Sequence, residues 1–357
     1  MDLKLEYSVV DLFCGIGGLT RGFLDVGFQV EAGIDIDEDC RYAYEKNNNS
    51  NFVSKSVSDL SKEDLLKLYP KGKKKILIGC APCQPFSIFN QKSDGKVSEQ
   101  NSERWKLLYS FSKLIDSTRP EIVSMENVPL LKTFKNGKVL KDFIGSLKSY
   151  GYHVSAEIYD SQYYGVPQRR KRLVLLASLK GPIEMIPYTH LDQIVTVKKA
   201  IGSMAKINSG DIHTKDMLHR SRKLNELNLK RIKATPEGGG WKDWDLELVA
   251  DCHKKEGGKA YGSAYGRMSW NDVAPTMTTY CVGYNNGRFG HPTQDRAISL
   301  REAAILQSFP KNYEFIDPNR TFSSGRIAKQ IGNAVPVGLG QAIAKSVEIH
   351  LKKFNDE

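Results

Sequence analysis

The sequence predicts an α/β protein in which a doubly wound parallel sheet is joined to a second, smaller domain rich in loops. Residues 7–179 alternate short apolar runs with amphipathic stretches, which is the pattern of βαβ units. From about 181 to 296 that rhythm fails, and glycine, tryptophan, tyrosine, lysine and arginine become frequent. Apolar residues at helical spacing return at 300–307 and 337–351, so we expect the chain to come back to its first domain.

The expected strands are apolar runs that are too short for helices and end in glycine, cysteine or polar residues. In chain order they are residues 8–13, 29–34, 75–80, 121–125, 153–159 and 172–177. The expected helices lie between them, where apolar residues recur every three or four positions and so form one face. They are residues 19–26, 38–44, 105–117 and 140–149. The predicted domains are therefore 1–180, 181–296 and a return segment, 297–357.

The composition favours an acidic partner and no membrane. Among 357 residues, 52 are Lys or Arg and 41 are Asp or Glu, a formal net charge of +11. Such a balance suits a polyanion such as nucleic acid. No apolar stretch approaches the roughly 20 residues of a membrane span, and the first residues lack a basic region followed by an apolar one. We expect a cytoplasmic protein.

The six cysteines are too few and too scattered for a disulfide framework. Cys80-Ala-Pro-Cys83 has the C-x-x-C spacing of redox and zinc sites, so a metal or disulfide site is an alternative. A zinc site needs a second pair of ligands, and Cys252 and His253 are adjacent, which is poor geometry for chelating one ion. No metal is expected.

Three strand ends carry residues that can react with or bind a ligand. Cys83, within Pro82-Cys83-Gln84, follows the first, Glu126-Asn127 ends the second, and the glycine-rich run from Asp11 to Gly18 follows the third. Ligands of open α/β sheets bind outside the carboxyl ends of the strands. A nucleophile, a carboxylic acid and a backbone cradle for a cofactor are thus expected at one edge.

The glycine run stands between a strand and a helix, as a nucleotide-binding turn does, although its spacing is not G-x-G-x-x-G. Asp35 ends the next strand, where an acidic side chain can accept hydrogen bonds from ribose hydroxyls. Asp59, followed by Leu60, could accept one from an adenine amino group. The alternative is a tight turn with aspartates that cap helices.

Together these segments closely resemble the DNA (cytosine-5) methyltransferase family. The resemblance covers both ends of the chain and leaves the middle segment undetermined. The matching segments, in family order, are D-L-F-x-G-x-G-G at Asp11–Gly18, Pro82-Cys83-Gln84, Glu126-Asn127-Val128, Q-x-R-x-R at 168–172, R-E-x-x-x-L-Q-x-F-P at 301–310 and Gln330-Ile-Gly-Asn-Ala-Val-Pro336. The resemblance implies a Rossmann-like sheet of the kind that binds S-adenosyl-L-methionine.

The resemblance also implies a mechanism and its catalytic residues. Cys83 attacks C6 of cytosine as a thiolate, so that C5 can take the methyl group of S-adenosyl-L-methionine. Glu126, when protonated, donates to N3, and Arg170 binds O2. Arg170 and Arg172 are the nearest candidates for stabilising the thiolate.

Further residues are expected to bind the cofactor or DNA. The cofactor set is Asp11, Phe13, Gly15, Gly17, Gly18, Asp35, Ile36, Asp59, Leu60, Pro82, Leu107, Asn333 and Ala334. The resemblance implies that Phe13 packs on the adenine of the cofactor. At the position of Asp35 the family commonly has a glutamate. The DNA set is Gln84, Ser87 and Phe89 in the loop after the nucleophile, with Gln168, Arg267, Thr276 and Arg288. Residues 181–296 are expected to be the target recognition domain.

The biological setting implied is a bacterial restriction-modification system. The partner is double-stranded DNA, from which the target cytosine is swung out before reaction. We expect a monomer in the bacterial cytoplasm, associated with the nucleoid, with a cognate restriction endonuclease acting separately.

Three alternatives remain. The tRNA-modifying branch carries a Cys-Phe-Thr signature in its recognition region, and this chain contains none. A catalytically silent relative that only binds DNA is disfavoured because Cys83, Glu126 and Arg170 are all present. A nicotinamide dehydrogenase lacks the glycine fingerprint and leaves Pro82-Cys83 unexplained.

Overall fold

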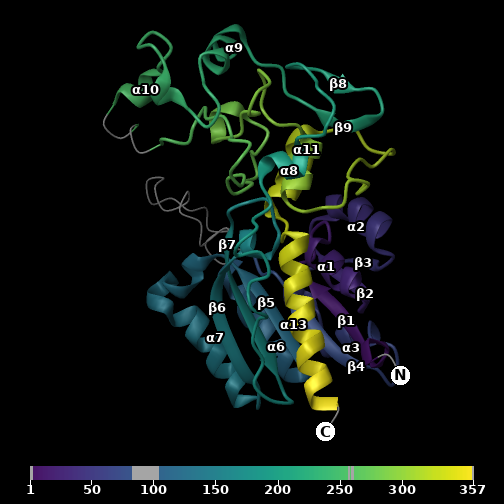
Figure 1. Ribbon diagram of the computed structural model, residues 1–357. Coiled ribbons are helices and arrows are strands. Elements are labelled where there is room, and N and C mark those ends of the chain that lie inside the picture. Colours follow the sequence, from purple (N-terminus) through teal and green to yellow (C-terminus); the bar gives the residue numbers. More distant parts are fainter. Residues whose placement is uncertain (1–2, 83–103, 256–257, 259–260, 356–357) are drawn as a thin grey trace. The chain divides into compact units, whose positions relative to one another are not determined.

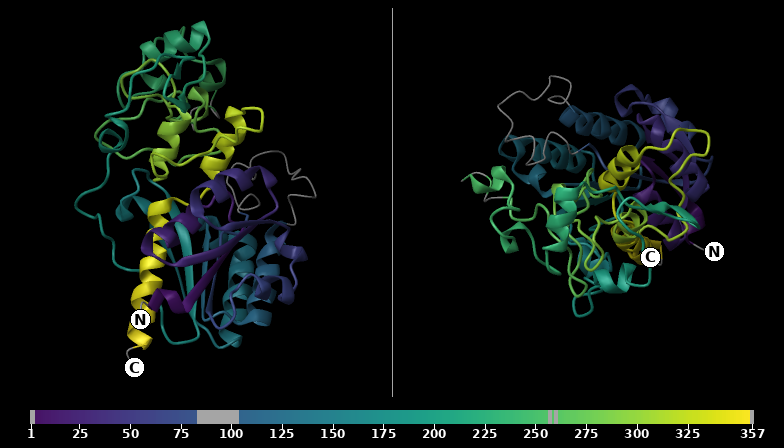
Figure 2. Two further views of the ribbon diagram at one scale, coloured as in Figure 1. Left: turned by 90° about the vertical axis from the view of Figure 1, so that its right-hand side faces the viewer. Right: turned by 90° about the horizontal axis from the view of Figure 1, so that it is seen from above.

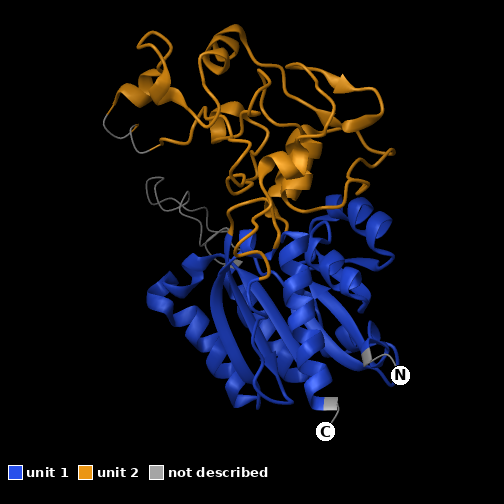
Figure 3. Cartoon of the chain, in the orientation of Figure 1, with its two compact units in different colours: residues 1–164, 171–188, 335–357 blue, residues 165–170, 189–334 orange. Residues whose placement is uncertain are grey.

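The computed structural model describes residues 3–82, 104–255, 258 and 261–355 (Figure 1). The chain divides into two compact units (Figure 3). Unit 1 comprises Met1–Tyr164, Lys171–Tyr188 and Val335–Glu357, and unit 2 comprises Gly165–Arg170 and Thr189–Ala334. Unit 2 is thus inserted into unit 1, and the chain passes between the units four times.

A seven-stranded sheet organises unit 1, in the order β3-β2-β1-β4-β5-β7-β6. The strands are β1 (Tyr7–Leu12), β2 (Gln29–Asp35), β3 (Asn51–Ser54), β4 (Lys74–Gly79), β5 (Ile122–Asn127), β6 (His153–Asp160) and β7 (Lys171–Ser178). The first five strands pair in parallel, and β7 pairs antiparallel with both β5 and β6. The predicted doubly wound sheet is confirmed, and the six expected strands agree to within one or two residues at each end.

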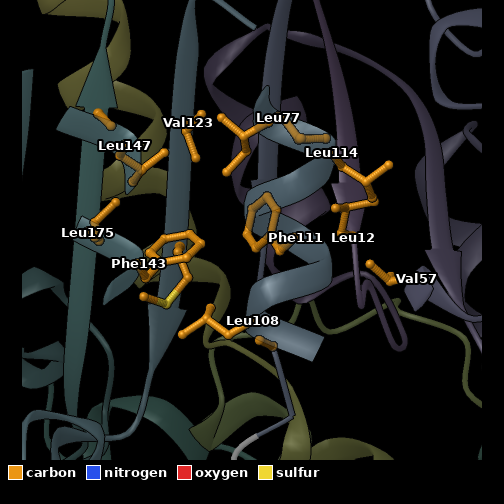
Figure 4. Close-up of a cluster of buried hydrophobic side chains, with 14 of the residues drawn as sticks. Leu12, Val57, Leu77, Leu108, Phe111, Leu114, Val123, Phe143, Leu147 and Leu175 are labelled. Atoms are coloured by element: carbon orange, nitrogen blue, oxygen red, sulfur yellow. The ribbon is translucent and has the colours of Figure 1, made fainter. Parts of the chain in front are cut away.

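Alternating side chains divide the apolar core into two clusters, one on each face of the sheet. Along β1, Val10 and Leu12 belong to the first cluster and Val9 to the second. Figure 4 shows the first cluster, in which Phe111 and Phe143 lie over the strands. Because both faces are buried, the strands read as continuous apolar runs, and this made them visible in the sequence.

Helices cover both faces of the sheet. Those of unit 1 are α1 (Gly18–Val26), α2 (Arg41–Asn48), α3 (Lys62–Lys67), α6 (Leu107–Thr118), α7 (Lys138–Ser149) and α13 (Val337–Asn355). Short 3-10 turns are η1 (Leu3–Glu6), η2 (Glu38–Cys40), η3 (Val57–Asp59), η5 (Arg104–Lys106), η6 (Pro129–Lys132), η7 (Phe134–Gly137) and η8 (Ser161–Tyr164). Figures 1 and 2 show α13 along one face and α6 and α7 on the other. Within the described ranges, no helix is both long and apolar enough to cross a membrane.

Unit 2 is rich in loops, as its composition predicted. Its helices are α8 (Val197–Ile201), α9 (Glu226–Lys233), α10 (Asp251–Lys254), α11 (Leu300–Leu306) and α12 (Ser324–Asn333), with turns η9 (Trp241–Asp243) and η11 (Tyr284–Asn286). A two-stranded hairpin pairs β8 (Ile212–His213) with β9 (Asp216–Arg220). An aromatic cluster forms one core: Trp241 stacks on His253 with ring centres 4.5 Å apart, and Trp244 meets Tyr265 edge-on.

The compact units divide the chain differently from the predicted boundaries at 180 and 296. Residues 297–334 belong to unit 2, although they were expected to rejoin the first domain. A buried ion pair links this segment to the residue before it, because Arg296 holds both carboxylate oxygens of Glu302 at 2.7 Å. Burial acts to raise the pKa of Glu302, but the hydrogen bonds and the charge of Arg296, together with smaller contributions, lower it. Arg301 also binds Asp216 of β9.

Helices α1 and α13 approach each other closely at two glycines, Gly22 and Gly340. A Cβ atom on Gly22 would lie 2.4 Å from the carbonyl carbon of Gly340. In a helix, alanine is favoured over glycine by about 1 kcal/mol, but overpacking costs about 1–3 kcal/mol. We therefore expect Gly22→Ala to lower the free energy of unfolding by about 1–2 kcal/mol, measured by urea denaturation.

Gly145→Ala in α7 is the matched control, because a Cβ there meets nothing within 4 Å. It should raise stability by up to about 1 kcal/mol. Equal stabilisation by both substitutions would show that α1 and α13 are not in close contact.

Candidate active site

The register of the parallel strands aligns four strand ends of unit 1 along one edge of the sheet. Leu12 of β1 pairs with Ile34 of β2 and with Gly79 of β4, and Gly79 pairs with Met125 of β5. The residues that come directly after these positions therefore lie along the carboxyl edge, where open α/β sheets bind ligands. They are Phe13, Asp35, Cys80 and Glu126.

The glycine loop between β1 and α1 turns through three left-handed positions. The φ angles are 60° at Phe13, 51° at Gly15 and 83° at Gly17. A phenylalanine in this region costs about 1–3 kcal/mol, which is the kind of strain found at ligand sites. A Cβ on Gly15 would meet nothing within 4 Å, so the loop has open space beside it. The Phe13 ring meets Phe111 edge-on, with ring centres 6.4 Å apart.

Asp35 ties the end of β2 to the glycine loop. Its Oδ2 accepts a hydrogen bond from the backbone N–H of Gly15 at 2.8 Å, and its Oδ1 accepts one from Asp37 at 2.9 Å. Burial raises the pKa of this carboxyl. Asp35 therefore fixes the shape of the loop, and the ribose contact expected of it stays a prediction.

Asp11 supports the same loop from beneath. Its Oδ2 accepts a hydrogen bond from the Thr20 hydroxyl at 2.6 Å, and that hydroxyl lies 3.2 Å from the Tyr44 hydroxyl. Complete burial raises the pKa of Asp11 to about 7. Asp11 therefore ties the end of β1 to Thr20 of α1, its Oδ1 forms no hydrogen bond with a described residue, and the cofactor contact expected of it stays a prediction.

The other residues predicted to bind the cofactor differ in exposure. Ile36, directly after Asp35, is 73% exposed, which is unusual for an isoleucine at a strand end. Asp59 is exposed, whereas its neighbour Leu60 is buried in the first core cluster. Leu107 begins α6, half-buried, Gly17 precedes α1 and Gly18 is its buried first residue.

Glu126 is a buried carboxyl with two neighbours of different kinds. It is 2% exposed, and its Oε2 accepts a hydrogen bond from the Cys80 thiol at 2.7 Å. Its Oε1 lies 2.9 Å from Nε of Arg172, within ion-pair distance. No described residue forms a hydrogen bond with Oε1. A buried oxygen without such a bond has capacity left for a ligand.

Four predicted site residues, Cys83, Gln84, Ser87 and Phe89, lie outside the described residues. Pro82, half-buried, is the last described residue before them. Asn127 holds this turn, because its side-chain amide donates to the Ala81 carbonyl at 3.1 Å. The Glu-Asn motif signalled this residue, but the role of its amide was not predicted.

Within unit 2 the structure corrects the roles expected of Gln168 and Arg170. Gln168 is buried and donates to the Leu306 carbonyl and the Gln307 side chain, so it does not present its amide to DNA. Arg170 is also buried, and donates to the carbonyls of Met277, Gly332 and Ala334 at 2.9, 3.0 and 3.3 Å. Both bind the segment 165–170 to the rest of unit 2.

Thr276 and Gln307 hold the same region together. The Thr276 hydroxyl donates to the Arg169 carbonyl at 2.7 Å. The DNA contact expected of Thr276 stays a prediction. Gln307, which sequence reasoning left without a role, donates to the Ile331 carbonyl at 2.7 Å. Asn333 ends α12 with an exposed side chain, next to the half-buried Ala334.

Arg267 was expected to contact DNA, and its burial shows that this is wrong. It is 4% exposed, and its guanidinium donates to the carbonyls of Ile232, Thr235, His291 and Gln294 and to Asp295. Arg288 is half-buried and donates through Nη1 to the carbonyls of Gly238, Gly239 and Arg267. Both guanidinium groups therefore stabilise loops of unit 2.

No group of three or more His, Cys, Asp and Glu side chains in the described part of the chain is arranged to hold a metal ion.

The fold is shared with proteins of known structure that are described as methyltransferases. One is a prophage-encoded protein of E. coli described as a DNA modification methyltransferase, with a TM-score of 0.74, 21% identity, and coverage of 98% of this chain and 100% of that one. Another is the Entamoeba histolytica methyltransferase EhMeth, with a TM-score of 0.59, 16% identity, and coverage of 97% and 99%. At these identities the likeness shows the fold.

Sequence comparison identifies the family. The C-5 cytosine-specific DNA methylase family matches residues 7–348. The Type II methylase M.HgiDII of Herpetosiphon aurantiacus is 51% identical over 350 residues, which cover 98% of this chain and 97% of that protein. The Type II methyltransferase M.PspPI of Psychrobacter sp. is 30% identical, with coverage of 96% and 79%. The chain belongs to the C-5 cytosine-specific DNA methylase family and is a DNA (cytosine-5)-methyltransferase, a transferase of class EC 2.1.1.

The buried position of Arg267 generates a stability prediction. Arg267→Leu leaves the carbonyl groups of Ile232, Thr235, His291 and Gln294 without their donor, and each buried acceptor left unsatisfied costs about 1–3 kcal/mol, so that together they cost roughly 3–5 kcal/mol or more. We expect a loss of that size, or a failure of unit 2 to fold, in thermal and urea unfolding.

Arg169→Leu is the matched control, because Arg169 forms an exposed ion pair with Asp272 that is worth about 0–1 kcal/mol. If Arg267→Leu kept full stability and flattened the salt dependence of DNA binding by about one unit of slope, Arg267 would be a phosphate contact after all.

Proposed function

We propose that the chain transfers the methyl group of S-adenosyl-L-methionine to C5 of a cytosine within a short, specific sequence of duplex DNA. We further propose that it is the modification enzyme of a Type II restriction-modification system. Family membership and the Type II relatives support the reaction and the setting. The observation that carries the catalytic assignment is Glu126, a buried carboxyl at the sheet edge whose Oε1 has no hydrogen-bond partner among the described residues.

The glycine loop and its neighbours fit S-adenosyl-L-methionine. The loop has open space beside Gly15, and its Phe13 ring can pack on adenine. Ile36 offers an exposed apolar surface, and Asp59 an exposed carboxylate for the adenine amino group. Gly17, Gly18, Pro82, Leu107, Asn333 and Ala334 complete the proposed set, and when bound the cofactor supplies an electrophilic methyl group.

Cys83 would open the reaction by forming a bond between its sulfur and C6 of the cytosine. This makes C5 nucleophilic, so that it can take the methyl group. Loss of the C5 proton and departure of the Cys83 thiolate then restore the aromatic ring. A cytosine in a duplex cannot present C6 to a thiol, so it must first be swung out, at a cost of a few kcal/mol.

Glu126 and Arg172 would stabilise the charge that develops on the pyrimidine during this attack. Protonated Glu126 donates to N3, an interaction that strengthens in the transition state. Arg172 lies beside Oε1 of Glu126, and this supports assigning it the O2 contact that sequence reasoning gave to Arg170. The three carbonyl groups held by Arg170 make it a bracing residue.

Unit 2 would read the DNA sequence, with Gln84, Ser87 and Phe89 contacting the target from the loop after Cys83. The loop-rich composition of unit 2 and the family's organisation support this assignment. We further propose that the enzyme acts as a monomer on the nucleoid in a bacterial cytoplasm. We also propose that an endonuclease of the same specificity acts separately, because the relatives are Type II modification enzymes by name.

The central test is methylation of plasmid DNA followed by bisulfite sequencing. The wild-type protein should protect cytosine at one short sequence, and Cys83→Ser should abolish turnover while cofactor affinity stays within about twofold. A duplex with 5-fluorocytosine at the target should trap the wild type as an adduct that survives denaturation, because fluorine blocks the elimination that frees Cys83.

Cys252→Ser is the matched control, because Cys252 is an exposed cysteine of unit 2 and should keep full activity. Labelling of a tRNA pool instead of plasmid DNA would overturn the proposed substrate. Normal turnover by Cys83→Ser would overturn the mechanism.

Glu126→Gln should slow methyl transfer by about 2 to 4 orders of magnitude, the scale of a positioned proton donor. Its affinity for duplex DNA should change by less than about threefold, because the carboxyl is buried and acts on the base in the transition state. Single-turnover rates and binding titrations measure the two effects. Equal losses of rate and affinity would mean that Glu126 maintains structure and does not donate a proton.

A further inference from the structure

Cys80 is brought to Glu126 by the pairing of two strands. Gly79 of β4 is paired with Met125 of β5, so the next residues, Cys80 and Glu126, follow in register at the carboxyl edge. The Cys80 N–H donates to the Leu12 carbonyl at 3.2 Å, which fixes the backbone where β4 ends. The Cys80 thiol donates to Oε2 of Glu126 at 2.7 Å.

The two oxygens of Glu126 have different surroundings as a result. Oε2 holds the thiol, whereas Oε1 is buried and forms no hydrogen bond with a described residue. The last torsion of a glutamate side chain is soft and roughly two-fold, so its own geometry does not decide which oxygen faces a ligand. A donor on one oxygen removes this freedom. Arg172 Nε lies within ion-pair distance of the other oxygen, Oε1, but forms no hydrogen bond with it, so among the described residues the Cys80 thiol is the donor that fixes the carboxyl.

We propose that Cys80 is a positioning residue for catalysis, which holds Oε2 of Glu126 so that Oε1 is presented to N3 of the target cytosine. This inference rests on the proposed role of Glu126 as the proton donor. The thiol is a neutral donor, so it orients the carboxyl without adding a second positive charge beside Arg172.

The test is a double-mutant cycle between Cys80 and Glu126, read as single-turnover methyl transfer to a duplex carrying the recognised sequence. Cys80→Ala should lower the rate by about three- to tenfold, the range of one hydrogen bond. Its KM for the methyl donor and its affinity for DNA should stay within about twofold. Cys80→Ser, which keeps a donor, should recover most of the lost rate.

In a Glu126→Ala background the carboxyl is absent, and Cys80→Ala should then cause no further loss. An equal loss in both backgrounds would overturn the inference, because Cys80 would then act on something other than Glu126. Unchanged rates for Cys80→Ala in the wild-type background would overturn it too. Thermal unfolding of each variant separates a loss of rate from a loss of fold.

The cycle also separates this inference from the proposed function. If Glu126→Ala methylates at the wild-type rate, the role of Glu126 as the proton donor is wrong. If Glu126→Ala is slow and Cys80→Ala is independent of it, only the positioning role of Cys80 fails.

Discussion

The register of the parallel strands is the constraint on which the rest of unit 1 depends. Pairing of Leu12 with Gly79, and of Gly79 with Met125, aligns the ends of β1, β4 and β5. A slip of one residue would turn each side chain to the other face and bury the wrong set. The two apolar clusters thus fix the register, and the register in turn sets the glycine loop, Cys80 and Glu126 along one edge.

Unit 2 is held together in another way. It has only a short hairpin among its described residues, so few of its backbone carbonyls can be satisfied in a sheet. Buried guanidinium groups satisfy such carbonyls instead: Arg170, Arg267 and Arg296 each donate to backbone carbonyls of segments far apart in the sequence. The planar guanidinium, with five donors, can bridge several loops at once. Part of the positive charge of this chain therefore belongs to buried arginines that stabilise unit 2.

The sequence predicted the sheet better than the loops. Strands buried on both faces are apolar along their length, and β1, β4 and β5 were found for that reason, whereas β3 is short and has two polar ends, Asn51 and Ser54. Glu126 was predicted from its motif at a strand end. The burial of Gln168 and Arg267 was not, because their partners are backbone carbonyls contributed by distant segments, and these leave no mark in the sequence. The Cys80 contact was not predicted either, because it depends on the register between β4 and β5.

Helix α13 completes the core of unit 1, but the ribosome makes this helix only after the inserted residues of unit 2. The second apolar cluster joins Phe23 of α1 to Leu339 and Ile343 of α13, which lie more than 300 positions apart. A ribosome that adds about 5–20 residues per second needs roughly seven to thirty seconds to produce the inserted residues 189–334. During that interval one face of the nascent sheet lacks its last helix. Chaperones that hold apolar surfaces have this window in which to bind.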